Sequence, residues 1–160
     1  MFHRLSCHDS NAGCKSRQHC QTWKIIVNKK SYIVNGIVRY KPDGWVIIEC
    51  PLSVVNYYRF WVEKFIGKKT STSLHFPHCT VVAGKHDKGK EKHPNWKKYD
   101  GIKVQVQYDS QIYTDHDWFT QGEYFWLRVS CPYIKIIRNS LGLNDSPYHP
   151  PHLTVCFRGY

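Results

Sequence analysis

The sequence repeats itself at Trp45-Val-Ile-Ile-Glu-Cys-Pro51 and at Trp126-Leu-Arg-Val-Ser-Cys-Pro132, which share the spacing Trp-x₄-Cys-Pro. Each copy is followed by a helix-like segment and then by a second matching stretch. This stretch reads His75-Phe-Pro-His-Cys-Thr-Val-Val-Ala-Gly84 in the first half and His149-Pro-Pro-His-Leu-Thr-Val-Cys-Phe-Arg-Gly159 in the second. A pattern that recurs in the same order is the mark of an internal duplication. The sequence therefore predicts a duplicated β-α-β unit.

Local patterns between the repeated stretches agree with this prediction. Pro51 and Pro132 lie where a first helical turn would begin, a position that proline tolerates well. Apolar residues then recur at the spacing of one helix face, at Val55, Tyr58, Val62 and Phe65 in the first copy and at Ile134, Ile137 and Leu141 in the second. Gly67 and Gly142 follow these runs and predict the helix ends. Further strands are predicted at 24–27, 37–40 and 103–108, a polar loop at 109–122 and a mobile lysine-rich loop at 85–98.

Composition narrows the class of protein. The chain has 160 residues, of which 41% are hydrophobic and 15% aromatic, which suits one folded domain and argues against disorder. No apolar run approaches the ~20 residues of a membrane span, and the first residues lack the apolar core of a secretory signal, so we expect a cytoplasmic protein. The net charge of +11 favours an anionic partner, nucleic acid or nucleotide, over a merely solvated basic surface.

The seven cysteines are an odd number, and without a secretory signal they are expected to be reduced thiols. Weak candidates for a zinc site crowd the N-terminus, at Cys7, Cys14, His19 and Cys20. Their spacing matches no common zinc finger, so a loosely ordered tail is the favoured interpretation and no metal is expected. The chain is accordingly divided into a Cys/His-rich extension, 1–22, and a single domain, 23–160, with lobes at about 34–100 and 101–160.

The chemistry-bearing residues are the paired histidines and threonines of the second repeated stretch. In a strand, residues i and i+2 point to the same face, so His78 projects with Thr80, and His152 with Thr154. A two-fold relation between the copies would bring both faces to one cleft. One neutral imidazole could then accept a proton while the other, protonated, donates one, and the hydroxyls could bind phosphate oxygens. A single His-x-Thr would be an ordinary half-buried strand face, but two copies in matching contexts indicate a site.

These motifs, His78-Cys-Thr-Val81 and His152-Leu-Thr-Val155, resemble the 2H phosphoesterase superfamily, and the resemblance covers 34–160. Within this superfamily, the sequence is most similar to phage anti-CBASS cyclic-oligonucleotide phosphodiesterases. The stretches that carry this similarity are Gly36-Ile-Val-Arg-Tyr-Lys-Pro-Asp-Gly-Trp-Val-Ile-Ile-Glu-Cys-Pro51, Tyr57-Tyr-Arg-Phe-Trp61, Lys97-Lys-Tyr-Asp-Gly101 and Tyr124-Phe-Trp-Leu127. The N-terminal extension has no counterpart in this pattern, and the sequence ends just past the second motif.

The resemblance implies an α+β, bilobed 2H phosphoesterase-like fold with antiparallel sheets around a central cleft. It implies metal-independent hydrolysis of 3′,5′-linked cyclic di- or trinucleotides to linear products through a 2′,3′-cyclic phosphate, with catalytic His78, Thr80, His152 and Thr154. No cofactor, membrane or long nucleic acid would be required, and the setting would be the host bacterial cytosol, where the enzyme counters antiphage signalling.

Alternatives to this function stay open at this stage. One is a 2H enzyme acting on RNA 2′,3′-cyclic phosphate ends or 2′,5′ linkages, and another is a non-catalytic RNA-binding module. Tyr40 and Trp118 are the candidates for stacking on substrate bases; a core position for Tyr40 and a loop anchor for Trp118 are the competing interpretations. Trp45 and Trp126, repeated inside predicted strands, are expected in the core.

Overall fold

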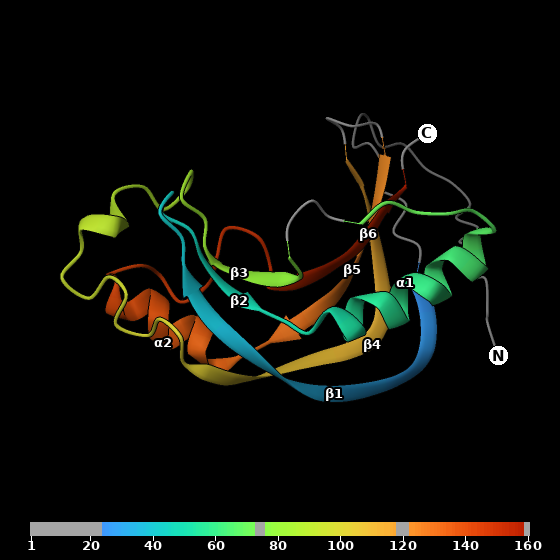
Figure 1. Cartoon of the computed structure of the whole chain (residues 1–160), viewed down its shortest axis with the longest axis horizontal. Coiled ribbons are helices and arrows are strands. Elements are labelled where there is room, and N and C mark those ends of the chain that lie inside the picture. The colour runs from blue at the N-terminus through green and yellow to red at the C-terminus, as the bar shows by residue number, and fades with distance from the viewer. Residues whose placement is uncertain (1–23, 73–75, 118–121, 159–160) are drawn as a thin grey trace, which may run out of the picture.

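The computed structural model describes residues 24–72, 76–117 and 122–158, with side chains from Lys30 onward except those of residues 116 and 117 (Figure 1). Its elements are β1 (Lys24–Tyr40), β2 (Val46–Glu49), α1 (Leu52–Ile66), β3 (His78–Val82), η1 (Lys90–Lys92), β4 (Lys103–Asp117), β5 (Gly122–Ser130), α2 (Pro132–Ser140) and β6 (His152–Arg158). Predictions that concern Cys7, Cys14, His19, Cys20 and Trp118 lie outside the described residues.

The same series of elements occurs twice along the chain. β1, β2, α1 and β3 form the first series, and β4, β5, α2 and β6 form the second. In the sheet the order is β3-β2-β1-β4-β5-β6, so the second series mirrors the first across the β1–β4 pair. The repeated unit is thus β-β-α-β, one strand longer than the sequence predicted, because each half begins with a long strand that joins the two halves.

All neighbouring strands are antiparallel, and the prediction of a mixed fold with antiparallel strands is confirmed. The predicted separate sheets are one continuous sheet instead. The reason is the long pairing of β1 with β4, which runs from Lys24 opposite Tyr113 to Ile37 opposite Lys103. The strands predicted at 24–27 and 37–40 are therefore parts of the single strand β1.

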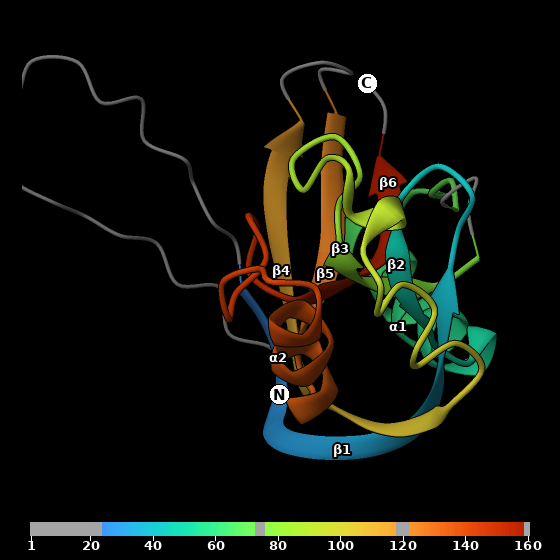
Figure 2. The same cartoon turned by 90° about the vertical axis from the view of Figure 1, so that its left-hand side faces the viewer.

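The sheet curls until its two edges meet. β3 and β6 are the outermost strands in the pairing order, yet they contact one another, and both views show them side by side (Figures 1 and 2). The helices cross between the halves: α1 contacts β6, and α2 contacts β3. Each helix thus stabilises the edge strand of the other half, and the nearly closed sheet holds the two repeated motifs together.

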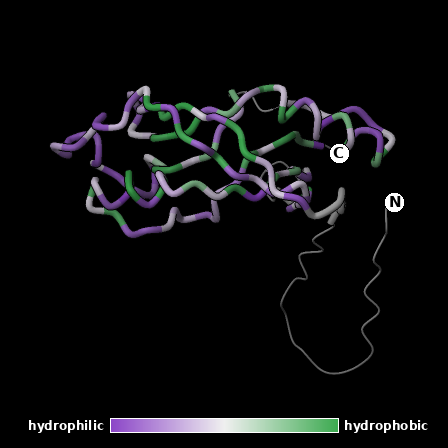
Figure 3. The backbone as a smooth tube through the Cα atoms, turned by 90° about the horizontal axis from the view of Figure 1, so that it is seen from below, coloured by the Kyte–Doolittle hydropathy of each residue, from purple (hydrophilic) through white to green (hydrophobic). Residues whose placement is uncertain are grey.

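The core lies on the face of β3 and β6 opposite to the motif histidines. Cys79 and Val81, which alternate with the motif residues, are fully buried, as are Leu153 and Val155. This confirms the predicted alternation, since residues of opposite parity face opposite sides of a strand. Hydrophobic stretches accordingly follow the strands in the middle of the molecule (Figure 3).

The helix ends mostly follow the sequence signals. Gly67 caps the C-terminal end of α1 with a left-handed backbone (φ 67°) that suits a residue without a side chain, and α2 begins at Pro132. Pro51 precedes α1 in an extended conformation instead of lying in its first turn. In the described part of the chain, neither helix combines the length and the apolarity that a bilayer span requires.

Two predicted loops are more ordered than their composition suggests. Most of the predicted loop 109–122 belongs to β4, where Ser110, Gln111 and Thr114 are buried polar residues of a strand. The predicted mobile loop 85–98 is anchored at both ends. Asp87 pairs with the buried Arg138, and Trp96 packs against the core. Arg138 belongs to the other half of the chain and Trp96 meets Tyr40 of the distant strand β1, which is why local composition did not reveal these contacts.

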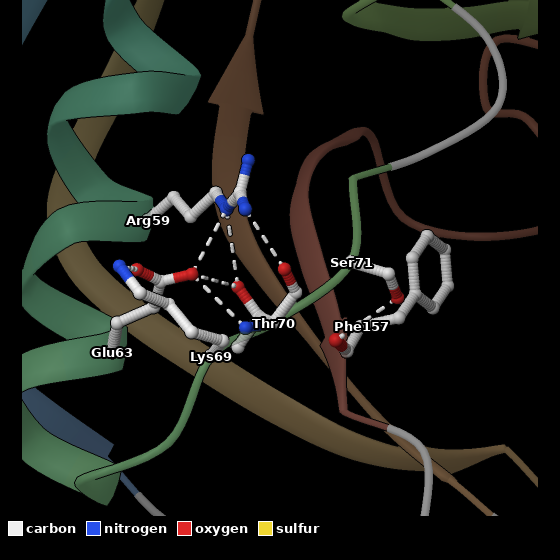
Figure 4. A network of polar contacts seen from close by, with 6 residues as sticks. All are labelled: Arg59, Glu63, Lys69, Thr70, Ser71 and Phe157. Carbon is white, nitrogen blue, oxygen red and sulfur yellow. Dashed lines mark hydrogen bonds and ion pairs between the residues drawn. The ribbon is translucent and has the colours of Figure 1, made fainter.

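A polar network joins the end of α1 to β6 (Figure 4). The guanidinium of Arg59 donates to the Thr70 carbonyl at 2.8 Å, and the carboxylate of Glu63 accepts the Thr70 N–H at 2.9 Å. The next residue, Ser71, exchanges backbone hydrogen bonds with Phe157 of β6 at 2.9–3.0 Å. The network therefore fixes the segment that leads from α1 toward β3 against the other half.

Candidate active site

The two motif histidines line one hollow, of about 250 Å³, which we call the motif hollow. His78 is the first residue of β3 and His152 is the first residue of β6, and the two strands are neighbours in space. Thr80 lines the same hollow. The sheet thus brings together residues that are 74 positions apart in the chain.

Each motif histidine is held in the same way. His78 Nδ1 lies 2.8 Å from the Phe76 carbonyl oxygen, and His152 Nδ1 lies 2.9 Å from the Pro150 carbonyl oxygen. A carbonyl oxygen only accepts hydrogen bonds, so in both rings the proton belongs on Nδ1. The neutral tautomer then carries its lone pair on Nε2, where it can accept a proton, and the imidazolium carries an N–H there that can donate one.

Proline sets up this geometry in both copies. Pro77 and Pro151 directly precede the motif histidines and cannot donate to a sheet ladder, so each strand starts at the histidine. The carbonyls of these prolines accept hydrogen bonds from Cys50 and Val129, at 2.8 Å and 3.1 Å. The carbonyl one residue earlier is therefore the one that the imidazole ring meets.

The threonines take different places around the site. Thr80 lines the motif hollow together with His78. Thr154 lies two residues beyond His152 on the same strand face, directly opposite Trp126 of β5, and is partly buried. The motif hollow is not lined by Thr154, so the structure places three of the four motif side chains around it and the fourth alongside.

The repeated tryptophans lie at the site, and the prediction that they belong to the core is wrong. Trp45 is partly exposed, precedes β2 and lines the motif hollow. Trp126 places its ring 5.8 Å from the His152 ring, stacks on Tyr113 at 4.6 Å, and donates from Nε1 to Asp115 at 3.0 Å. A register shift between Phe125 and Trp126 in the β5–β6 pairing accompanies this placement, and such an irregularity is not visible in a sequence.

A second pair of histidines forms another part of the wall. His86 stacks on Tyr148, with ring centroids 4.4 Å apart and planes 9° apart, and His149 meets the Tyr148 ring edge-on at 4.7 Å. Burial, with the nearby His152, His86 and Lys85, lowers the pKa of His149. The sequence singled out neither His86 nor Tyr148, because His86 lies in the lysine-rich segment that had been interpreted as a mobile loop. His149 also lines the hollow.

Charged side chains flank both histidines. Glu49 lies opposite His78 in the β2–β3 pairing and binds Arg39 at 3.2 Å and Lys41 at 3.1 Å. Partial burial acts to raise the pKa of Glu49, but these two cations outweigh it and the pKa is lowered. Arg128 lies opposite His152 and is 5.0 Å from the centre of the Tyr113 ring. Lys85 lines the motif hollow itself, so the surroundings favour an anionic ligand.

Tyr40, proposed from the sequence as a stacking residue, lies in the core. Its side chain is 7% exposed, and its ring meets Trp96 edge-on at 4.8 Å. Burial raises the pKa of Tyr40 to about 12. The alternative interpretation, a strand aromatic in the core, describes its position. Tyr40 lines neither the motif hollow nor a second hollow that His78 also lines, which is described below.

The geometry offers no metal site among the described residues, since no group of three or more histidine, cysteine or acidic side chains is placed to hold an ion there. The four cysteines of this part of the chain are free and buried. Comparisons of the chain with protein-family models, with curated proteins and with solved structures found no match.

Proposed function

We propose that the protein is a 2H-type phosphodiesterase that opens 3′,5′-linked cyclic di- or trinucleotides without a metal ion and so counters bacterial antiphage signalling. One observation carries the proposal: two imidazoles line one hollow, and each is oriented by a carbonyl bond to Nδ1 so that Nε2 is the reactive nitrogen. Equivalent tethering of two histidines serves acid–base catalysis, because one ring must accept a proton while the other donates one.

The reaction would proceed by attack of a ribose 2′-hydroxyl on the adjacent phosphorus. Nε2 of one neutral histidine takes the hydroxyl proton as the O2′–P bond forms. The P–O5′ bond breaks, and the leaving O5′ receives a proton from Nε2–H of the other, protonated histidine. The ring is thereby opened and ends in a 2′,3′-cyclic phosphate, which water then opens with the two proton transfers reversed. Because His78 and His152 are held alike, their contacts do not distinguish the base from the acid.

Other side chains would bind the substrate. The Thr80 hydroxyl can donate to a non-bridging phosphate oxygen, and the ammonium of Lys85 adds positive charge in the same hollow. Tyr148 is 71% exposed although it stacks on His86, so this flat pair presents a free face on which a base could stack. Trp45 offers a second aromatic surface beside His78.

The test is incubation of the purified protein, in excess EDTA, with a panel of cyclic di- and trinucleotides, linear 2′,5′-linked dinucleotides and RNA with a 2′,3′-cyclic phosphate end. Product masses from chromatography identify the bond that is broken. We expect opening of cyclic substrates, with a 2′,3′-cyclic phosphate as the transient product. Turnover of the RNA end or the 2′,5′ linkage alone would assign the site to the alternative 2H activity, and no turnover of any member would contradict the proposal.

A further inference from the structure

A second hollow, of about 340 Å³, adjoins the motif hollow and shares two residues with it, Trp45 and His78. We call it the side hollow, and its other lining residues are Lys41, Asp43, Ile47 and Phe76. Its volume is in the range of pockets that bind small organic ligands, ~300–1,000 Å³. A ligand that occupied both hollows would pass His78, so the side hollow is placed to receive the base next to the reacting phosphate.

The walls of the side hollow are apolar and aromatic. Phe76 is 57% exposed, which is high for a large hydrophobic side chain, and Trp45 and Ile47 line the same space. Aromatic rings that face a hollow are surfaces on which a nucleobase stacks. The carbonyl of Phe76 is the acceptor for His78 Nδ1, so this aromatic residue is also tied to the reactive histidine.

Asp43 contributes a carboxylate to the lining of the side hollow. Its Oδ1 accepts the backbone N–H of Trp45 at 3.4 Å, and its Oδ2 has no hydrogen bond to any described residue. The other charged side chain of the hollow, Lys41, is bound to Glu49 at 3.1 Å instead of Asp43. The Asp43 carboxylate is therefore available to a ligand, and an ionised carboxylate only accepts hydrogen bonds.

We propose that the side hollow selects guanine, with Asp43 accepting hydrogen bonds from N1–H and from the 2-amino group. Guanine is the base whose pairing edge presents these two donors next to each other. Adenine and cytosine present one amino donor beside a ring acceptor, and uracil presents one donor between two carbonyls, which a carboxylate repels. This inference rests on the proposed function, and it names the base that a cyclic nucleotide substrate would carry next to His78.

The inference is tested by binding of mononucleotides, which does not depend on hydrolysis. Calorimetry measures the affinities of guanosine, inosine and adenosine 5′-monophosphates, which share the same sugar and phosphate. The pairing edge of guanine offers Asp43 two hydrogen-bond donors, that of hypoxanthine offers one, and that of adenine places an amino donor beside a ring acceptor. We expect guanosine monophosphate to bind about fivefold or more tightly than adenosine monophosphate, since a good bidentate contact discriminates between bases by at least that factor. Inosine monophosphate, which lacks the 2-amino group, should fall between them.

Variants locate the effect at Asp43. Asp43→Asn keeps Oδ1 as the acceptor for Trp45 N–H but removes the second acceptor, so it should abolish the preference for guanine while leaving the melting temperature unchanged. Phe76→Leu should weaken all three nucleotides alike, because stacking does not read the pairing edge. Asp145→Asn, which breaks an exposed ion pair with Lys135, is the matched charge control.

Equal affinity for guanosine and adenosine monophosphates, or a preference that survives Asp43→Asn, would overturn the inference. Either result leaves the opening of cyclic nucleotides in EDTA unaffected. Conversely, a guanine preference without any hydrolysis would support guanine selection by the side hollow and contradict the proposed function.

Discussion

The thiol of Cys79, the residue that directly follows His78, lies beside the backbone of His152, which acts to lower the thiol pKa. This proximity brings the start of β3 next to the start of β6, where the two edges of the sheet meet. Burial raises the pKa of Cys79 above its ordinary value, so the thiol remains protonated and serves as a small packing group. The relative position of the two imidazoles therefore depends on the volume at residue 79.

Enlarging this residue should separate the motifs. We predict that Cys79→Leu, which adds volume to a fully buried position, destabilises the protein by ~1–3 kcal/mol and lowers turnover of the cyclic substrate at least tenfold. Cys156→Leu is the control, because Cys156 is equally buried but lies near Thr70 and Arg59 of the α1 network. Urea unfolding and initial rates separate the effects. If both variants lose stability and activity in parallel, Cys79 has no special part in positioning the histidines.

Arg138 joins the second half to the first and should be critical for stability. Its side chain is 2% exposed and donates to the Val81 carbonyl at 2.8 Å, to Asp87 at 2.9 Å and to the Asn144 side chain at 2.6 Å. Arg138→Met removes the guanidinium donor of all three acceptors and should lower the free energy of unfolding by ~3–5 kcal/mol.

Lys135→Met provides the comparison, because it breaks an exposed ion pair with Asp145 and should cost less than ~1 kcal/mol. Chemical denaturation measures both variants. An Arg138→Met protein as stable as Lys135→Met would show that the buried network contributes little.

Glu63 makes stability sensitive to acid. The backbone N–H of Thr70 and the ammonium of Lys69 hold the pKa of Glu63 at about 2, below its ordinary value of 4.5. The folded state thus binds fewer protons than the unfolded chain, and the contribution of Glu63 is present above pH 4.5 and is lost as the pH falls toward 2. Glu63→Gln should flatten the stability profile in this window, and Glu91→Gln, at an exposed position, should not. Parallel profiles for the wild type and Glu63→Gln would contradict the assignment.

His149 should make the stability of the protein depend on pH in a higher range than Glu63 does. Its pKa is lowered by burial and by the neighbouring His152, His86 and Lys85, so below the ordinary value of 6.5 the unfolded chain binds the proton more readily than the folded protein. Stability should therefore fall as the pH is lowered through this region, and His149→Gln should reduce the fall. Thermal melting between pH 5 and pH 8 measures it; an unchanged slope would show that His149 stays solvated.

The sequence predicted much of this arrangement from the duplication and the alternation in the motif strands. His78 and His152 could be assigned to one face because Cys79 and Leu153 had to face the core, and both are buried. Trp45 and Trp126 were placed wrongly because register shifts at Val46/Ile47 and Phe125/Trp126 interrupt the regular pairing beside each of them.

Other site residues could not be predicted because long-range contacts position them. His86 follows Lys85 in a segment whose composition suggested a mobile loop, yet Asp87 is fixed by Arg138, 51 residues away. Tyr148 lies in a proline-rich stretch without periodicity, and its partner is His86. Tyr40 was a reasonable stacking candidate because it is aromatic. The prediction was wrong because β1 directs its side chain toward Trp96 and the core.

In the proposed mechanism, His78 and His152 act as an acid–base pair without a metal. The most direct measurement is the rate of opening of a cyclic dinucleotide in excess EDTA by the wild type, His78→Gln, His152→Gln and His93→Gln. The control, His93, accepts the Asn95 N–H at 3.1 Å and lies outside both hollows. We predict a bell-shaped pH profile for the wild type, an unchanged rate for His93→Gln, and a loss of ~10²–10⁴-fold for each motif variant with the fold intact. A wild type that leaves the substrate unopened, or a His152→Gln variant that retains its rate, would contradict the claim.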